Sequence, residues 1–265
     1  MQYLSFFKLR FVTGLQYIFS AIAGLATQFF WGAMMIFLYE AFYKNGIDVP
    51  MKWSELVSYV WLGQAFYTLV FARVINNDVF ESIKTGQISY ELVRPLNIYW
   101  LWYIKISAQR LSACAIRFLP VIILAVLLPA QYSLKSPDSI PAFLLFITTL
   151  VLGLILTSAL SMIVYIFMFY TTSCKGIFSI YGVIADFFSG MIIPIVFMPQ
   201  AFQTLSYIFP FRLCMDLPMR LYVGNIGIDE GIKTMIMQIA WILILMIIGN
   251  FFMNRATKRV VVQGG

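Results

Sequence analysis

The chain contains no histidine and few charged residues. Of its 265 residues only 11% are charged, whereas an ordinary soluble domain has about 25%. Without histidine the chain cannot perform histidine-based acid–base catalysis, build a Ser–His–Asp triad or bind a metal through imidazole. Its three cysteines, Cys114, Cys174 and Cys214, are scattered and have no metal-binding spacing. We interpret them as small buried apolar residues.

Further signals for enzymatic chemistry are also missing from the sequence. No Gly-x-x-x-x-Gly-Lys-Ser/Thr pattern is present, so nothing here predicts a P-loop for ATP. We expect no metal or cofactor on this chain and no catalytic residues of its own. The first residues lack a short apolar segment with a small-residue cleavage site. We therefore expect no removable signal peptide, and we expect the first apolar span to act as an uncleaved signal.

The sequence is dominated instead by long apolar segments. Hydrophobic residues make up 62% of the chain and the mean hydropathy is +0.88. A membrane-spanning helix needs about 20 apolar residues, so six spans and their loops account for the whole chain as a single all-α, polytopic membrane domain, 1–265. We place the spans near 17–39, 55–75, 112–130, 143–170, 177–196 and 234–254.

The distribution of basic residues predicts the orientation of these spans. Twelve lysines and arginines fall on the side that holds both termini, against six on the other side. By the positive-inside rule both termini are cytoplasmic. We therefore read the charge of +7 as a sign of membrane topology and expect no nucleic-acid partner. The first group consists of Lys8, Arg10, Arg73, Lys84, Arg94, Lys105, Arg110, Arg117, Lys175, Arg255, Lys258 and Arg259.

Residues 1–16 mix apolar side chains with Lys8, Arg10 and Gln16. Such a pattern suits an amphipathic helix lying in the inner membrane interface. The alternative is that this segment simply extends the first span.

The one substantial cytosolic loop, which we place at 76–96, contains a short amphipathic helix. Asn77 or Asp78 can cap it, Glu81 completes a capping box with Asp78, and Gly86 can end it, which predicts a helix near 78–85. A second short element follows at 88–93. The apolar face of the helix contains Val79, Phe80 and Ile83, and its polar face contains Asp78, Glu81 and Lys84.

The apolar face of this helix needs a partner. It either docks into a groove of a soluble protein and transmits movement, or packs on the inner surface of the chain itself. The sequence leaves both possibilities open.

The fifth span carries one acidic residue, Asp186. A charged side chain at the bilayer centre costs about 2.5–3.5 kcal/mol on insertion scales. Gly182, Asp186 and Gly190 are four residues apart and would share one helix face. We interpret that face as a dimer seam or substrate path. Alternatively Asp186 pairs with a basic residue such as Arg117, or accepts a hydrogen bond from a hydroxyl group.

The second span carries polar residues of its own. Gln64 and Tyr67 share a face and, with Arg73, could line a cavity for an amphipathic substrate. Aromatic residues at this spacing also occur as ordinary packing.

Three prolines interrupt the apolar segment after the fifth span: Pro194, Pro199 and Pro210. Proline removes a backbone donor and disfavours helix at the residue before it. Irregular backbone in hydrocarbon must pack on protein or line a cavity. We therefore predict that the span ends near Pro194 and that 194–212 forms a re-entrant helical hairpin, which is more typical of a translocation machine than of an anchor.

Two sequence stretches resemble those of the ABC-2 type transporter permeases, in the branch of small six-span bacterial proteins. One runs from Ile83 to Leu96 after the second span. The other begins at Ser189, passes through Pro194 and Pro199, and ends at Arg212. The order and spacing of these stretches carry the resemblance, and the six-span plan extends it over nearly the whole chain.

The resemblance implies an exporter subunit in a bacterial cytoplasmic membrane. Such permeases pair with an identical or homologous permease chain and with two copies of a cytosolic ATPase, which binds ATP and Mg. It further implies that Asp78–Thr85 is the coupling helix, that the hairpin is extracytoplasmic, and that the second and fifth spans line the path. Two other functions remain open from the residues: an ion-coupled carrier using Asp186, and a membrane scaffold that transports nothing.

Overall fold

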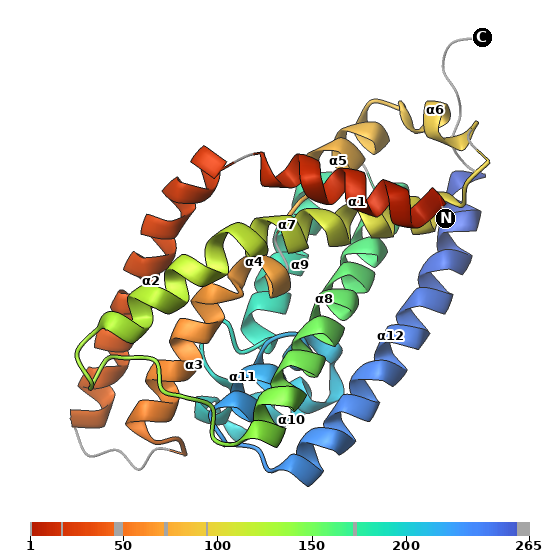
Figure 1. Ribbon diagram of the computed structural model, residues 1–265. Helices are drawn as coiled ribbons and strands as arrows, with labels where there is room; N and C mark the ends of the chain where they lie inside the picture. Colours follow the sequence, from red (N-terminus) through yellow and green to blue (C-terminus); the bar gives the residue numbers. More distant parts are fainter. Residues whose placement is uncertain are drawn as a thin grey trace.

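The computed structural model describes residues 2–16, 18–44, 50–71, 74–93, 95–171 and 174–258. These residues form helices joined by turns and loops, and no strand occurs among them (Figure 1). The elements are α1 (Gln2–Leu15), α2 (Ile18–Lys44), α3 (Trp53–Ala65), α4 (Tyr67–Val70), α5 (Asn77–Lys84), α6 (Ile88–Leu92), α7 (Ile98–Leu127), α8 (Ile140–Met168), α9 (Cys174–Phe188), η1 (Ile195–Phe197), α10 (Gln200–Ile208), η2 (Pro210–Leu213), α11 (Asp216–Tyr222) and α12 (Ile228–Thr257). The predicted all-helical membrane architecture is confirmed.

Four of the described helices are long and apolar enough to cross a membrane. They are α2 from Ala23 onwards, α7, α8 and α12. Their exposed side chains include many large apolar residues, such as Phe37 on α2, Leu127 on α7 and Ile247 on α12. Exposing such apolar surfaces to water costs free energy, whereas contact with lipid chains does not. The chain is therefore a polytopic membrane protein.

The second and fifth predicted spans are shorter than expected. Phe66 separates α3 from α4, and α4 ends at Val70, where the prediction continued to residue 75. Helix α9 has 15 residues, which is about 22 Å and less than the roughly 30 Å of a bilayer core. Most residues of α3 are buried, whereas α9 buries only Phe178, Gly182, Ala185 and Asp186.

The third span begins 14 residues earlier than predicted, at Ile98 rather than residue 112. Its N-cap is Asn97, whose side chain accepts hydrogen bonds from the backbone N–H groups of Tyr99 and Trp100. Lys105 and Arg110 therefore lie within this helix and are buried, although their charges favoured a cytosolic loop. Each finds partners in the fold that its flanking sequence does not reveal. Arg73, Arg94 and Arg259 lie outside the described residues.

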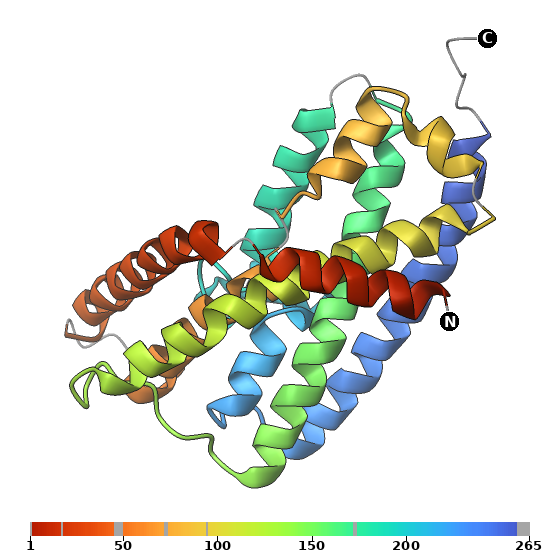
Figure 2. The same cartoon turned by 45° about the horizontal axis from the view of Figure 1, so that its top comes forward.

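Gln2–Leu15 forms a separate helix, α1, so the alternative of a straight extension of the first span is wrong. Helix α1 packs across α7, and the view of Figure 2 shows it turned well away from the direction of α2. Leu4, Leu9 and Val12 are exposed on it. An interfacial helix requires such an exposed apolar side, and the position of α1 in the membrane interface stays a prediction.

The proline-rich segment and the residues that follow it, up to Tyr222, form four short helical elements: η1, α10, η2 and α11. Pro194 and Pro199 are the N-caps of η1 and α10, and Pro210 is the first residue of η2. Proline suits these positions because the first residues of a helix have no intrahelical partner for their N–H groups. Every residue of α11 is buried, and α11 packs against α8, α3 and α12. In Figure 1 this group lies at the end of the molecule opposite α5 and α6.

The contact between α8 and this group depends on Gly153. A Cβ atom on Gly153 would lie 2.8 Å from the backbone oxygen of Cys214, so Gly153→Ala would push two backbones apart. We expect a destabilisation of about 1–3 kcal/mol, as for other overpacked sites, measured as a lower thermal midpoint in detergent. Gly227→Ala is the matched control because no atom lies within 4 Å of its Cβ position. An equal change in both variants would contradict this packing.

Candidate functional site: the α5 end and a buried charge network

Helix α5 begins and ends with clear local signals. The side chain of Asn76 accepts a hydrogen bond from the Val79 N–H at 3.0 Å and is the N-cap. The predicted cap at Asn77 or Asp78, with its capping box to Glu81, is therefore wrong by one or two residues, because an asparagine one position earlier reaches the same donors. Gly86 follows the helix with φ of +76°, which favours glycine and confirms the predicted end.

The apolar face of α5 is buried within the chain. Val79 is 0% exposed and Phe80 6% exposed, and the Phe80 ring packs 6.2 Å from that of Phe178 on α9. Ile83 packs at the edge of the same cluster, which includes residues of α7 and α8. Of the two possibilities left open by the sequence, docking of this face into a soluble partner is thus wrong: the chain itself covers it.

The other face of α5 and its continuation into α6 remain open. Asp78, Glu81, Lys84 and Gly86 are exposed, and Glu81 pairs with Lys84 at 3.6 Å. Beyond Gly86, two large side chains project from the surface: Tyr90 is 78% exposed and Val93 is 85% exposed. Buried Ile88 and the contact of Glu91 with the Trp102 indole hold α6 against α7. Helices α5 and α6 are thus held against the rest of the chain, and together they expose a surface with both polar and apolar side chains.

Asp78 connects α5 to α1 and α7. Its Oδ2 atom lies 3.1 Å from Arg10 Nη1 and 3.3 Å from Lys105 Nζ. Partial burial of Asp78 raises its pKa, but the Lys105 and Arg10 charges outweigh that effect and hold the pKa of this carboxyl below its ordinary value. Asp78 is consequently ionised at neutral pH and links three helices electrostatically.

The residues predicted to line a path in the second span do not share one helix. Gln64 lies in α3 and Tyr67 in α4, on either side of the break at Phe66. Both are partly buried, and the Tyr67 ring stacks on Phe71 with centroids 4.2 Å apart. Arg73 lies outside the described residues. The role of these residues as the lining of a path stays a prediction.

The stripe predicted on the fifth span faces the interior of this chain. Gly182 and Asp186 are buried on α9, with Asp186 4% exposed. Gly190 follows the end of the helix with φ of +83°, so it belongs to a turn. Its predicted place on a shared helix face is therefore wrong. The exposed side of α9 carries Ile180, Val183 and Ile184 instead. The pairing of Asp186 with Arg117 stays a prediction.

A buried charge network lies beside Gly190. The Tyr59 hydroxyl donates to Asp216 Oδ1 at 3.2 Å and lies 3.1 Å from the Gly190 carbonyl oxygen. Asp216 Oδ2 lies 3.5 Å from Arg220 Nη1, and Arg220 Nε donates to Asn225 Oδ1 at 2.8 Å. Gly190 is needed here, because a Cβ atom would lie 2.6 Å from the Tyr59 hydroxyl.

Sequence reasoning missed this network. Arg212 and Arg220 are two of the six basic residues that the positive-inside rule places on the side opposite the termini, and Asp216 lies between them. All three are buried. The Arg212 guanidinium stacks over the Tyr207 ring at 4.1 Å. Charged residues at four-residue spacing were visible between Arg212 and Arg220. Only the packing of α11 against α3 and α8 shows that they are removed from solvent.

A further buried cation, Arg110, connects α7 to the end of α4 and to α8. Arg110 on α7 is 0% exposed. Its Nη1 donates to the Phe71 carbonyl at 2.6 Å and its Nη2 to Ser161 Oγ at 2.9 Å. The first bond satisfies the backbone where α4 ends, which is one reason that the second span can stop early.

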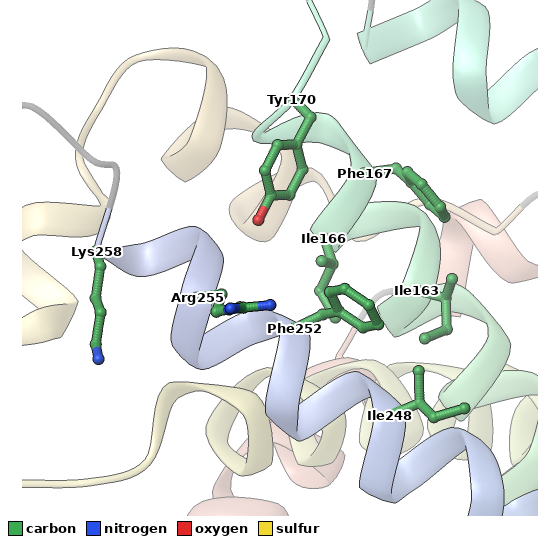
Figure 3. A pocket seen from close by; sticks show the side chains of 8 residues that line it. All are labelled: Ile163, Ile166, Phe167, Tyr170, Ile248, Phe252, Arg255 and Lys258. Carbon is green, nitrogen blue, oxygen red and sulfur yellow. The ribbon is translucent and has the colours of Figure 1, made fainter.

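An apolar groove with a basic end lies between α8 and α12. It has a volume of about 710 Å³, and Figure 3 shows Ile163, Ile166 and Phe167 on one wall facing Ile248 and Phe252 on the other. Arg255 and Lys258 come from the last turn of α12. The walls are exposed sides of two membrane-crossing helices, where lipid chains contact any membrane protein. The groove by itself therefore identifies no substrate.

The fold and these features define a polytopic helical membrane protein that combines an anchored helix at one end with buried charges at the other. The family described as ABC-2 family transporter protein matches the chain over residues 29–264. This chain belongs to that family, as the resemblance in its sequence implied. Searches of curated proteins and of solved structures gave no match.

Family membership makes the chain a multi-pass membrane protein and a permease subunit of an ABC transporter. It implies partnership with an ABC ATPase. The match begins at residue 29 and includes both α5 and the α10–α11 segment. Both regions described above are therefore part of the shared domain.

Proposed function

We propose that this chain is the membrane subunit of an ATP-driven exporter and that α5 and α6 form its contact with the ATPase. Binding of ATP and Mg to two ATPase copies closes them, α5 and α6 transmit the movement, and two permease chains, identical or homologous, rock apart. Movement can be driven in this way only if the two ATPase states contact the permease differently.

The observation that carries this proposal is the division of α5 into two faces. Its apolar face is locked into the core through Val79 and Phe80, so a force applied to α5 reaches α7, α8 and α9 directly. Its polar face, with Tyr90 and Val93 beyond it, is open to a partner. Aromatic residues surrounded by polar groups are typical of interface anchors.

The remaining features fit six spans with both termini in the cytoplasm of a bacterial cell. In this arrangement α3 with α4 forms the second span and α9 forms the fifth. The segment 194–212, with η1, α10 and the start of η2, is an extracytoplasmic re-entrant hairpin. The exposed face of α9, with Ile180, Val183 and Ile184, is the contact that we propose with the second permease chain. Residues 1–16 lie in the inner interface.

Co-purification of the ATPase tests the proposal. The tagged chain, expressed from its own operon, should bring down an ATPase, and the double variant Tyr90→Asp/Val93→Asp should recover at least about tenfold less of it. Two large side chains that become buried in the contact contribute more than about 1.4 kcal/mol, the free energy that corresponds to a tenfold change in affinity. The measurement is the ATPase-to-permease ratio in the eluate at equal folded permease.

Ile140→Asp is the matched control. Ile140 is also 78% exposed, but it is the first residue of α8, where a helix tolerates acidic groups. It should leave ATPase recovery unchanged. If the unmodified chain never recovers an ATPase, or if the chain alone moves solute against a gradient, the proposed function is wrong.

A further inference from the structure

The groove between α8 and α12 changes from apolar to basic along its length. Its walls consist of aliphatic and aromatic side chains, and Arg255 and Lys258 line one end (Figure 3). On α12 the lining residues Ile248, Phe252 and Arg255 recur every three or four positions, so they share one face of the helix. The apolar wall and the basic end therefore follow one another along the same side of α12.

The two cations at this end have no acidic partner. Among the residues that the structure describes, no aspartate or glutamate lines the groove, and no ion pair includes Arg255 or Lys258. The Arg255 guanidinium lies over the neighbouring Phe251 ring, 5.3 Å from its centroid, a contact that leaves its charge uncompensated. The lining thus carries a formal charge of +2.

The basic end coincides with the end of a membrane-crossing helix. Helix α12 is long and apolar enough to span a bilayer, Arg255 lies in its last turn and Lys258 is its C-cap. Acyl chains surround the middle of such a helix, whereas lipid headgroups lie near its ends. Ile248 and Arg255 are seven residues apart, which is about 10 Å along the axis. An occupant of the whole groove must therefore be elongated, with an apolar and an anionic part.

The groove has a fixed floor. Met253 and Ala256, on the inner side of α12, are 0% exposed and belong to the buried cluster that also contains Phe80 of α5. Ile166 of α8 belongs to this cluster too and reaches the groove. Ligand sites are usually concave and formed before the ligand binds. The tight packing beneath this groove meets that condition.

We propose that the groove binds an anionic phospholipid, with the phosphate at Arg255 and Lys258 and an acyl chain along the apolar walls. The planar guanidinium of Arg255 can form two hydrogen bonds with phosphate oxygens, and Lys258 adds a compact charge. Two cations without a carboxylate favour a lipid of net negative charge over a zwitterionic one, whose ammonium group they repel. The apolar walls favour a lipid over a soluble phosphate ester. This binding does not depend on the proposed coupling to an ATPase.

Native mass spectrometry of the purified, detergent-solubilised chain tests the basic end. Phosphatidylglycerol and phosphatidylethanolamine are added separately at equal concentration, and the lipid retained per folded chain is counted. We expect a preference for phosphatidylglycerol that falls by about fivefold in Arg255→Gln and further in Arg255→Gln/Lys258→Gln. Arg255→Lys should lie between wild type and Arg255→Gln, because it keeps the charge and loses the planar fork.

Lys8→Gln/Lys175→Gln is the matched control for charge. Both lysines are exposed and neither lines the groove. This control removes the same charge as the double groove variant and should leave the preference intact. No preference in the wild type, or an equal fall in the control, would overturn the proposal.

A second pair of variants tests the apolar wall with all charges retained. Ile248→Trp fills part of the groove and should lower the retention of phosphatidylglycerol by at least about fourfold, the effect of excluding one methylene group. Its neighbour Ile247 is 70% exposed and lies outside the groove, so Ile247→Trp should retain as much lipid as wild type.

Three outcomes would reject this occupant. Equal effects of the two tryptophan variants would show that the lipid does not lie in the groove. Displacement of phosphatidylglycerol by equimolar sn-glycerol 3-phosphate would overturn the assignment to a lipid. A dimer that retains no lipid, and that dissociates in Ile248→Trp but not in Ile247→Trp, would assign the groove to a second copy of the chain instead.

Discussion

Replacing Asp216 with alanine should largely abolish folded protein. Asp216 is 0% exposed, and its carboxylate faces the Tyr59 hydroxyl and the Arg220 guanidinium. Its removal leaves buried Arg220 and Arg212 without the nearby negative charge. Breaking a buried ion pair in this way costs about 3–5 kcal/mol, which is a large fraction of the stability of a typical domain. The readouts are the monodisperse fraction in size-exclusion chromatography and the thermal midpoint in detergent.

Two further variants make this result interpretable. Asp229→Ala removes an exposed carboxylate in the first turn of α12 and should change little. The double variant Asp216→Ala/Arg220→Met removes both charges and should recover part of the loss, because an apolar replacement of a buried pair is far less costly than one orphaned charge. If Asp216→Ala is as stable as Asp229→Ala, the network does not hold α11 in place.

Replacing Phe80 with aspartate should also prevent folding rather than only uncouple a partner. Phe80 lies in the cluster formed by α5, α7, α8 and α9 and packs on Phe178. A carboxylate there would be buried without a partner and would cost several kcal/mol. We expect a loss of the monodisperse peak in size-exclusion chromatography. Glu81→Lys, one residue away on the exposed polar face, should keep the wild-type elution profile and thermal midpoint.

This pair of variants distinguishes two mechanical arrangements of α5. If Phe80→Asp folds normally and loses only its ATPase, the apolar face would meet the partner, and the burial described above would not hold in the assembled transporter. If it fails to fold while Glu81→Lys is intact, the buried face is the anchor and the open face is the contact. Tests of coupling then have to be made at Tyr90, Val93 and the polar face.

Local sequence signals predicted the elements well and the contacts poorly. The helix at α5, its end at Gly86 and the separate segment before the first span all follow from signals within a few residues. The sequence did not reveal the break at Phe66, which places Gln64 in α3 and Tyr67 in α4. The spacing of residues along a helix shows which of them share a face, but it does not show what covers that face.

The sequence by itself determined that this is an all-helical membrane protein without histidine chemistry, and its motifs were sufficient for the ABC-2 family, because hydropathy and short-range signals are properties of neighbouring residues. Tertiary structure alone decided which charges are buried. Tyr59 and Asp216 are 157 positions apart, and Arg110 and Ser161 are 51 apart. The cost of burying a charge depends on the partner that the fold brings to it, and that partner lies too far along the chain for any local pattern to reveal.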